Sequence, residues 1–316
     1  MPGRTWLALK ENHMSTTIIQ TTGLSYRYAK DVQTLFDINL HIHKGDIYGF
    51  LGPNGSGKTT TLSLLLGLLT HQQGSIEIFG KDIRKHRVEV LRRIGSLIEV
   101  PSVYGHLTAR ENLEVYRPIY GVHVKRVNEV LEIVGLKDAG KKISKKFSLG
   151  MKQRLAIALA LLPGPELLIL DEPSNGLDPN GIIELRQLVK SLNKEHGMTI
   201  VISSHILSEV EKMVSHVGII YKGTMLFQGT LDELHSYQQK DAKLFIRTSN
   251  DEAAYSLLRE FKPVRTEEAL AVTFNALKEV AQINRILTEN ELDVYLLHPQ
   301  KNNLEQLFID LTTEAS

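Results

Sequence analysis

The sequence predicts an α/β fold built on a mostly parallel sheet, followed by a small α+β domain. From residue 15 onward, short apolar runs alternate with amphipathic segments, which is the pattern of buried parallel strands joined by crossover helices. From about residue 240 the pattern changes to shorter strands and helices that follow one another closely. A length of 316 residues agrees with two domains of about 150 residues each.

The composition excludes several classes of protein. Lys and Arg number 37 against 36 Asp and Glu, so the net charge of +1 gives no electrostatic reason to expect binding to nucleic acid or to an acidic membrane surface. The chain has no cysteine, which excludes a disulfide scaffold, thiolate metal sites and cysteine nucleophiles. No apolar run reaches the roughly 18 residues that span a bilayer, so we expect the chain itself to be soluble.

The N-terminal residues 1–14 (MPGRTWLALKENHM) contain an apolar patch that is too short for the core of a secretory signal. We expect them to be a flexible leader or a mis-annotated start. Met14 closely precedes the stretch TTIIQTTGLSYRY, which predicts the first strand, so we hypothesise that Met14 is the native start. The first domain is then expected at residues 15–232, and a second, accessory domain at residues 233–316.

Four apolar runs predict the parallel strands of the first domain, and two start signals place helices between them. Thr108 and Glu111 have the spacing of a capping box, which predicts a helix over about residues 108–118. Asp178-Pro179 combines a preferred N-cap residue with proline at the first helical position, and predicts a helix over about residues 179–194. The predicted strands are Asp46–Leu51, Ile94–Ile98, Leu167–Leu170 and Thr199–Ile202.

The second domain is predicted to consist of three strands that alternate with three helices. The strands are Leu244–Arg247, Leu270–Phe274 and Asp293–Leu297. The helices are Glu252–Phe261, Leu277–Leu287 and Asn303–Leu311.

A glycine-rich loop with a lysine follows the strand Asp46–Leu51 and opens a helix. Its glycines allow backbone N–H groups to wrap a β-phosphate, and the helix N-terminus adds partial positive charge. Lys58 can reach the β- and γ-phosphate oxygens, and the Thr59 hydroxyl can bind Mg²⁺. The alternative is a glycine-rich turn that matches by chance, but the strand, loop and helix context favours nucleotide binding. The predicted contacts to ATP are Gly52, Pro53, Asn54, Gly55, Ser56, Gly57, Lys58, Thr59 and Thr60.

Two adjacent carboxylates, Asp171 and Glu172, end the apolar strand Leu167–Leu170. By composition alone they could belong to a buried strand that meets a polar loop. Because strands of one parallel sheet bring their carboxyl ends to the same edge, we expect these side chains beside the phosphate loop. There Asp171 can hold Mg²⁺ through water, and Glu172 can orient an attacking water.

A second anion site is suggested by Ser148 and Gly150, which precede the apolar helix Leu155–Leu162. A helix N-terminus attracts anions, but one chain would not usually aim two such sites at a single phosphate. Ser148 is therefore either only a helix cap, which its local sequence favours, or it faces a nucleotide held by another subunit.

Five motifs, in this order and at compatible spacings, resemble those of the ATP-binding-cassette (ABC) ATPase family. They are the phosphate loop, Ser148-Leu149-Gly150, the strand that ends in Asp171-Glu172, the segment Ser174–Asp178 and His205. The resemblance covers about residues 15–230 and implies a P-loop NTPase cassette, with a mostly parallel sheet core and a helical subdomain.

The resemblance also implies how the motifs act. In this family two cassettes dimerise head to tail, and ATP lies between the phosphate loop of one and the signature serine of the other. Glu172 is then the general base, His205 contacts the γ-phosphate, and Asp178 lies in the loop that links the two sites. Tyr28 resembles the aromatic residue on which the family stacks adenine; Tyr26 is the competing assignment, and a plain strand tyrosine is a further one.

Two departures from the family pattern narrow the subfamily. The usual signature is Leu-Ser-Gly-Gly-Gln, whereas this chain has Phe147-Ser148-Leu149-Gly150-Met151. The strand Ile94–Ile98 should be followed by a glutamine that contacts Mg²⁺, yet position 99 is Glu99. Glutamate has the same shape and binds hard cations better, so we expect a position close to the metal. A surface glutamate after a strand is the alternative.

Together with the C-terminal domain, these departures look like the ATPases of bacterial exporters that confer bacitracin resistance or lantibiotic immunity. This implies a Mg²⁺-dependent ATPase that pairs with separately encoded permease subunits, forms a homodimer, binds no nucleic acid, and lies at the cytoplasmic face of the cell membrane through its permease. The alternatives are the ATPase of another exporter or importer, and a nucleotide-switched ABC protein that transports nothing.

Overall fold

The computed structural model describes residues 16–29, 32–98, 103–239, 242–266, 269–274 and 276–300. The chain forms two compact units, Met1–Gln228 and Gly229–Ser316. Their boundary falls shortly before residue 232, where we placed it from the sequence, and the function of the second unit as an accessory domain stays a prediction. The expected leader, residues 1–14, lies outside the described residues.

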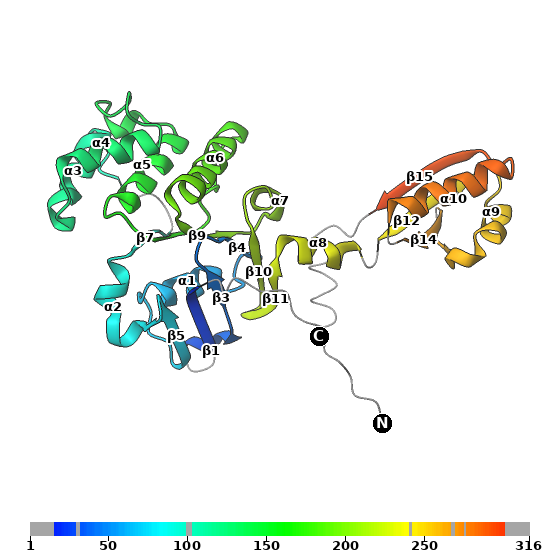
Figure 1. The fold of residues 1–316 in the computed structure, drawn as a ribbon, viewed down its shortest axis with the longest axis horizontal. Helices are drawn as coiled ribbons and strands as arrows, with labels where there is room; N and C mark the ends of the chain where they lie inside the picture. The colour runs from blue at the N-terminus through cyan, green and yellow to red at the C-terminus, as the bar shows by residue number, and fades with distance from the viewer. Residues whose placement is uncertain are drawn as a thin grey trace. The chain divides into compact units, whose positions relative to one another are not determined.

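The first unit is built around a six-stranded sheet (Figure 1). Its strands are β4 (Ile47–Leu51), β7 (Ile94–Leu97), β8 (Leu167–Leu170), β9 (Thr199–Ser204), β10 (His216–Tyr221) and β11 (Thr224–Thr230). They lie in the order β11-β10-β4-β9-β8-β7, and every pair from β10 to β7 is parallel. All residues of β4, β8 and β9 are buried, as in a parallel sheet that is covered on both faces. The prediction of a mostly parallel α/β core is confirmed.

A second, antiparallel sheet belongs to the same unit, and only its first strand was predicted. It contains β1 (Thr17–Ala29), β2 (Val32–Ile38), β3 (His41–His43), β5 (Gln73–Ile78) and β6 (Lys81–Asp82). The long strand β1 pairs with β2, β3 and β5. One apolar core joins this sheet to the parallel sheet, and it includes Ile19 of β1, Phe50 of β4 and Ile169 of β8. Each such buried side chain stabilises the fold by about 1.5–3 kcal/mol.

Three helices of the first unit contact one another: α3 (Ala109–Tyr120), α4 (Val124–Ile133) and α5 (Leu149–Leu161) (Figure 1). They form the helical subdomain that the family resemblance implies, and α5 also contacts β7. Further helices are α1 (Lys58–Leu65), α2 (Ile83–Leu91), α6 (Pro179–His196) and α7 (Leu207–Val210). In the part of the chain that the structure describes, no helix is both long and apolar enough to cross a membrane.

The helix start signals act as predicted. The Thr108 hydroxyl accepts a hydrogen bond from the backbone N–H of Glu111 at 3.2 Å, and the Glu111 carboxylate accepts one from the backbone N–H of Thr108 at 2.8 Å. Asp178 caps α6 by accepting from the backbone N–H of Gly181 at 2.9 Å. The apolar helix predicted from Leu155 begins earlier, at Leu149, because Ser148 is its N-cap.

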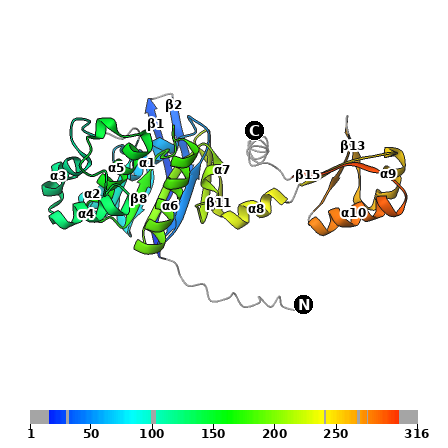
Figure 2. The same ribbon diagram turned by 90° about the horizontal axis from the view of Figure 1, so that it is seen from above.

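The second unit is an antiparallel sheet with helices. Its elements are α8 (Leu231–Gln239), β12 (Lys243–Thr248), α9 (Asp251–Leu257), a 3₁₀ turn (Arg259–Phe261), β13 (Val264–Arg265), β14 (Leu270–Thr273), α10 (Leu277–Glu289) and β15 (Val294–Gln300). The sheet order is β13-β14-β12-β15, and α10 lies along the sheet (Figure 2). Leu244 and Ile246 of β12 share a core with Ile283 and Leu287 of α10. The predicted strands and helices occur in the predicted order up to β15, but α8 and the fourth strand, β13, were not predicted. The predicted helix Asn303–Leu311 lies outside the described residues.

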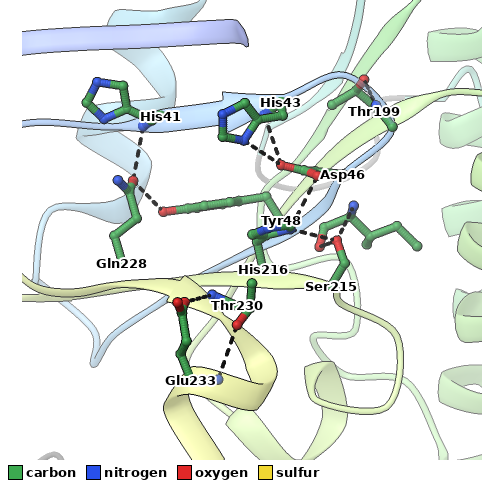
Figure 3. Close-up of polar contacts among 12 residues, drawn as sticks. His41, His43, Asp46, Tyr48, Thr199, Ser215, His216, Gln228, Thr230 and Glu233 are labelled. Carbon is green, nitrogen blue, oxygen red and sulfur yellow. Dashed lines mark hydrogen bonds and ion pairs between the residues drawn. The ribbon is translucent and has the colours of Figure 1, made fainter. Parts of the chain in front are cut away.

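A polar cluster lies at the start of β4, at the opposite end of that strand from the glycine-rich loop (Figure 3). The buried Asp46 accepts a hydrogen bond from the backbone N–H of His43 at 2.9 Å, and its other carboxylate oxygen lies 3.2 Å from Nδ1 of His216. Tyr48 donates to Oε1 of Gln228 at 3.0 Å. Burial, together with the Asp46 carboxylate, raises the pKa of Tyr48, so its hydroxyl stays protonated and keeps donating. The cluster therefore ties β3, β4, β10 and β11 together.

Replacing Asp46 should loosen this junction. Asp46→Asn keeps the shape of the side chain but turns one accepting oxygen into a donor that faces His43 or His216. We expect the free energy of unfolding to fall by about 1–3 kcal/mol, measured by urea denaturation. Asp138→Asn, at an exposed site, is the control and should change it by less than about 0.5 kcal/mol. Equal losses in the two variants would contradict the role of Asp46.

Candidate active site

The glycine-rich loop connects β4 to α1 and requires glycine at its two ends. Gly57 is the N-cap of α1 with φ of 108°, and a Cβ added there would lie 2.5 Å from Cδ2 of Leu35. A Cβ on Gly52 would lie 2.2 Å from the carbonyl oxygen of Ile220. A side chain at position 52 would collide with the backbone of Ile220, and one at position 57 would be strained at this φ and would displace the Leu35 side chain, so the glycines keep the loop closely packed against its neighbours.

Lys58, the first residue of α1, is directed back into this loop. It is 5% exposed, and its Nζ donates to the carbonyl oxygens of Gly52 at 2.7 Å and Pro53 at 3.1 Å. The same Nζ lies 3.2 Å from Oε1 of Glu172. A buried ammonium group therefore lies in the loop, hydrogen bonded to two carbonyl oxygens and close to a carboxylate, as expected of a phosphate-binding lysine.

The predicted metal ligands Thr59 and Asp171 lie in direct contact. The Thr59 hydroxyl donates to Oδ2 of Asp171 at 2.7 Å, and the Ser203 hydroxyl donates to Oδ1. Asp171 follows β8 and is 5% exposed. The parallel sheet has therefore brought the carboxyl end of β8 to the same edge as the loop, as we expected.

Glu172 has an unusual backbone conformation, with φ of 47°. Its backbone N–H donates to the Ser203 hydroxyl at 2.8 Å, and its Oε2 lies 2.8 Å from Nδ1 of His205. Its Oε1 is buried and, among the described residues, accepts no hydrogen bond, while Nζ of Lys58 is 3.2 Å away. The carboxylate is therefore held between a lysine and a histidine at the edge of the sheet.

The two tyrosines that compete for the adenine have different environments. Tyr28 is 60% exposed, and its hydroxyl lies 3.2 Å from the Thr60 hydroxyl on α1. Tyr26 is partly buried against the core that joins the two sheets. The rings meet edge to face, with centroids 5.0 Å apart. This geometry favours Tyr28, because its ring is exposed to solvent next to the loop helix.

Ser148, Gly150 and Asp178 are arranged around two neighbouring helix starts. The Ser148 hydroxyl accepts from the backbone N–H of Met151 at 3.2 Å, so the cap predicted for α5 is formed. A Cβ on Gly150 would lie 3.8 Å from Cδ2 of Leu177, which places the signature turn beside the turn that leads to Asp178. Within the described residues, neither Ser148 nor Asp178 hydrogen bonds to the phosphate loop.

Glu99 lies outside the described residues. In the described ranges, no group of three or more His, Cys, Asp or Glu side chains is placed to hold a metal ion. Sequence reasoning missed Ser203, which contacts both carboxylate residues; the signal that could have found it is its position two residues before His205 on the neighbouring strand.

Comparison with known proteins identifies the family of this chain. A family model described as ABC transporter matches residues 35–175. The bacitracin transport ATP-binding protein BcrA of Bacillus licheniformis is 46% identical over 301 residues, which cover 94% of this chain and 97% of that protein. The chain belongs to the family of ABC transporter ATP-binding proteins. As an ABC ATPase, it binds and hydrolyses ATP.

A lantibiotic transport protein and a solved cassette are also similar to this ABC ATPase. The lantibiotic transport ATP-binding protein SrtF of Streptococcus pyogenes is 46% identical over 198 residues, 63% of this chain and 85% of that protein. A dimeric ATP-binding cassette, solved in a post-hydrolysis state with ADP and Pi, has a TM-score of 0.60 and 25% identity, and covers 68% of this chain and 99% of its own.

Proposed function

We propose that this ABC ATPase drives the export of a peptide antibiotic, bacitracin or a lantibiotic, and so confers resistance or immunity. The observation that supports this most is the extent of the likeness to the Bacillus licheniformis protein, which spans 94% of the chain and therefore includes the second unit as well as the cassette. The likeness to the lantibiotic transport protein covers a smaller part of the chain at the same identity.

The proposal includes a membrane partner. A protein named as a transport ATP-binding protein supplies energy to a pathway that another subunit forms, so we expect separately encoded permease subunits. The ATPase would then lie at the cytoplasmic face of the cell membrane, attached through its permease. Two copies of the chain would form the homodimer that supplies two ATP sites.

The loop and the carboxylates suit ATP and Mg²⁺. In the proposed complex the loop amides and Lys58 bind the phosphate oxygens, and Tyr28 stacks on the adenine. Mg²⁺ would be held by Thr59 and Asp171, whose oxygens are already 2.7 Å apart, and by Glu99 as predicted from the sequence. When bound, the cation supplies positive charge to the β- and γ-phosphates.

Hydrolysis needs a base near the γ-phosphate, and Glu172 is suited to that role. Its carboxylate is positioned from two sides by Lys58 and His205, and it follows directly after Asp171. We propose that Glu172 takes a proton from the attacking water and that His205 orients the Glu172 carboxylate and contacts the γ-phosphate.

The turns around Ser148, Gly150 and Asp178 would serve the nucleotide of the partner copy. Ser148 is exposed at the N-terminus of α5, where the helix dipole and free backbone N–H groups favour an anion. Head-to-tail pairing would place these groups against the second copy's ATP. Binding of ATP would close the dimer, and hydrolysis would open it again.

The export function can be tested in a strain sensitive to bacitracin and to lantibiotics. The chain is expressed with the permease genes that neighbour its own, and minimal inhibitory concentrations are measured for bacitracin, a lantibiotic and an unrelated antibiotic. We expect the minimal inhibitory concentration of bacitracin or of the lantibiotic to rise at least about fourfold, and that of the unrelated antibiotic to stay the same. With Glu172→Gln we expect no rise. Unchanged sensitivity to both peptides, with active ATPase, would contradict export, and copurification with ribosomes would favour a function outside transport.

A further inference from the structure

A buried serine on β9 connects the two carboxylate residues of the active site. Ser203 is 0% exposed. Its hydroxyl donates to Oδ1 of Asp171 and accepts the backbone N–H of Glu172 at 2.8 Å. The hydroxyl therefore donates its single proton to the Asp171 carboxylate and accepts the Glu172 N–H with a lone pair.

The register of the sheet places the serine opposite these residues. Strands β8 and β9 are parallel, and Leu170 pairs with Ile202. Asp171 directly follows Leu170, and Ser203 follows Ile202 on β9, so the hydroxyl reaches across at the point where β8 ends. The serine is also two residues before His205, whose ring contacts the Glu172 carboxylate. Ser203 on β9 thus contacts the backbone of Glu172, and His205, just after β9, contacts its side chain.

The backbone conformation of Glu172 requires a contact of this kind. Its φ of 47° lies in the left-handed region, which is unfavourable for a residue with a Cβ and persists where surrounding contacts impose it. The hydrogen bond to Ser203 is made by the backbone N–H of this same residue. The peptide orientation decides where the Glu172 side chain leaves the strand, and so where its carboxylate lies relative to Lys58 and His205.

We infer that Ser203 is a positioning residue for ATP hydrolysis. Its hydroxyl fixes the Asp171 carboxylate and the Glu172 backbone relative to each other, so that the base points at the site of attack. This inference rests on the proposed role of Glu172 as the general base. Ser203 itself does not touch the substrate, and it acts on the rate of hydrolysis rather than on the affinity for ATP.

The test compares Ser203→Ala, Ser203→Val and Ser203→Thr in the full-length chain. Threonine and valine have nearly the same shape and differ in the hydroxyl. We expect Ala and Val to lower kcat about ten- to hundredfold, because small displacements of a catalytic group have effects of this size, and Thr to keep kcat within about threefold of wild type. KM for ATP should stay within about twofold in all three, as for an interaction that acts on the chemical step.

A matched control separates positioning from general loss of stability. The Thr21 hydroxyl, on β1, also donates one hydrogen bond and accepts one, to the carbonyl of Ile38 and from the backbone N–H of Leu40, both at 2.8 Å. Thr21→Val should lower the melting temperature while kcat, measured well below that temperature, stays unchanged. If Ser203→Ala does not fold, the comparison of Thr with Val decides the question.

The outcomes are distinguishable from failure of the proposed function. Equal kcat values for Ser203→Thr and Ser203→Val, or wild-type kcat in Ser203→Ala, would overturn the positioning role while Glu172→Gln remains inactive. Wild-type hydrolysis by Glu172→Gln, assayed in parallel, would overturn the base assignment and the positioning role together. A raised KM with unchanged kcat would also overturn the inference, since Ser203 would then act on binding.

Discussion

Glu172→Gln should reduce ATP hydrolysis about 10²- to 10⁴-fold, which is the range that a general base contributes. The carboxamide has nearly the shape of the carboxylate, so it can still lie between Lys58 and His205 and keep the edge of the sheet intact. It cannot take up the proton of the attacking water. Affinity for ATP should therefore stay within about threefold of wild type, because phosphate binding depends on the loop rather than on the base.

The measurement is steady-state phosphate release, together with calorimetric titration of ATP. With ATP and Mg²⁺ present, the variant should accumulate as a dimer in gel filtration, since the closed form would no longer be lost to hydrolysis. Glu166→Gln is the control: this glutamate directly precedes the same strand β8 at its other end, where it pairs with Arg93 at 2.6 Å. It should leave turnover unchanged. Substantial hydrolysis by Glu172→Gln would remove Glu172 as the base.

Local signals in the sequence predicted four of the five parallel strands, β4, β7, β8 and β9, whereas β10 and its neighbour β11 were missed. Leu167–Leu170 is continuously apolar and the other three runs are mostly apolar, because buried parallel strands need apolar side chains on both faces. The capping residues Thr108 and Asp178 are equally local, since each bonds to an N–H three residues on. Both helices therefore begin where the sequence indicated.

The antiparallel sheet of the first unit was mostly missed, because its strands lack a comparable signal. Strand β3 has three residues and β6 has two, and the seven residues of β2 alternate irregularly between buried and exposed. Strands β2 and β3 form because they pair with β1, and β6 forms because it pairs with β5; such pairing cannot be deduced from local sequence.

In the active site too, local motifs identify residues, whereas the contacts between them depend on the fold. The identities of Lys58, Asp171 and Glu172 follow from motifs, but the contact between Lys58 and Glu172 depends on two loops that meet only in the fold. Ser203 was missed because its importance depends on the register between β8 and β9. For Ser148 the local sequence favoured a helix cap, and the cap is formed; any contact with a nucleotide depends on a second copy of the chain.

Lys58→Ala should lower the affinity for ATP about 100-fold, because hydrogen bonds to charged groups are worth about 1.5–3 kcal/mol each and the lysine is the buried cation of the loop. Hydrolysis should fall with binding. Calorimetric titration of ATP measures the effect. Lys137→Ala is the control, since this exposed lysine pairs with the exposed Glu132 at 2.9 Å in the helical subdomain, and it should leave affinity unchanged.

The same substitution should also change the stability of the protein without nucleotide. Lys58→Ala removes the cation beside a Glu172 oxygen that is buried and accepts no hydrogen bond among the described residues, and breaking a buried pair from one side costs about 3–5 kcal/mol. The double variant Lys58→Ala/Glu172→Gln removes the uncompensated charge, so it should regain about 1–3 kcal/mol of that loss in urea denaturation. If the effects of the two substitutions simply add, the two side chains do not interact, and the carboxylate is held in position by His205, with Ser203 holding only the backbone of Glu172.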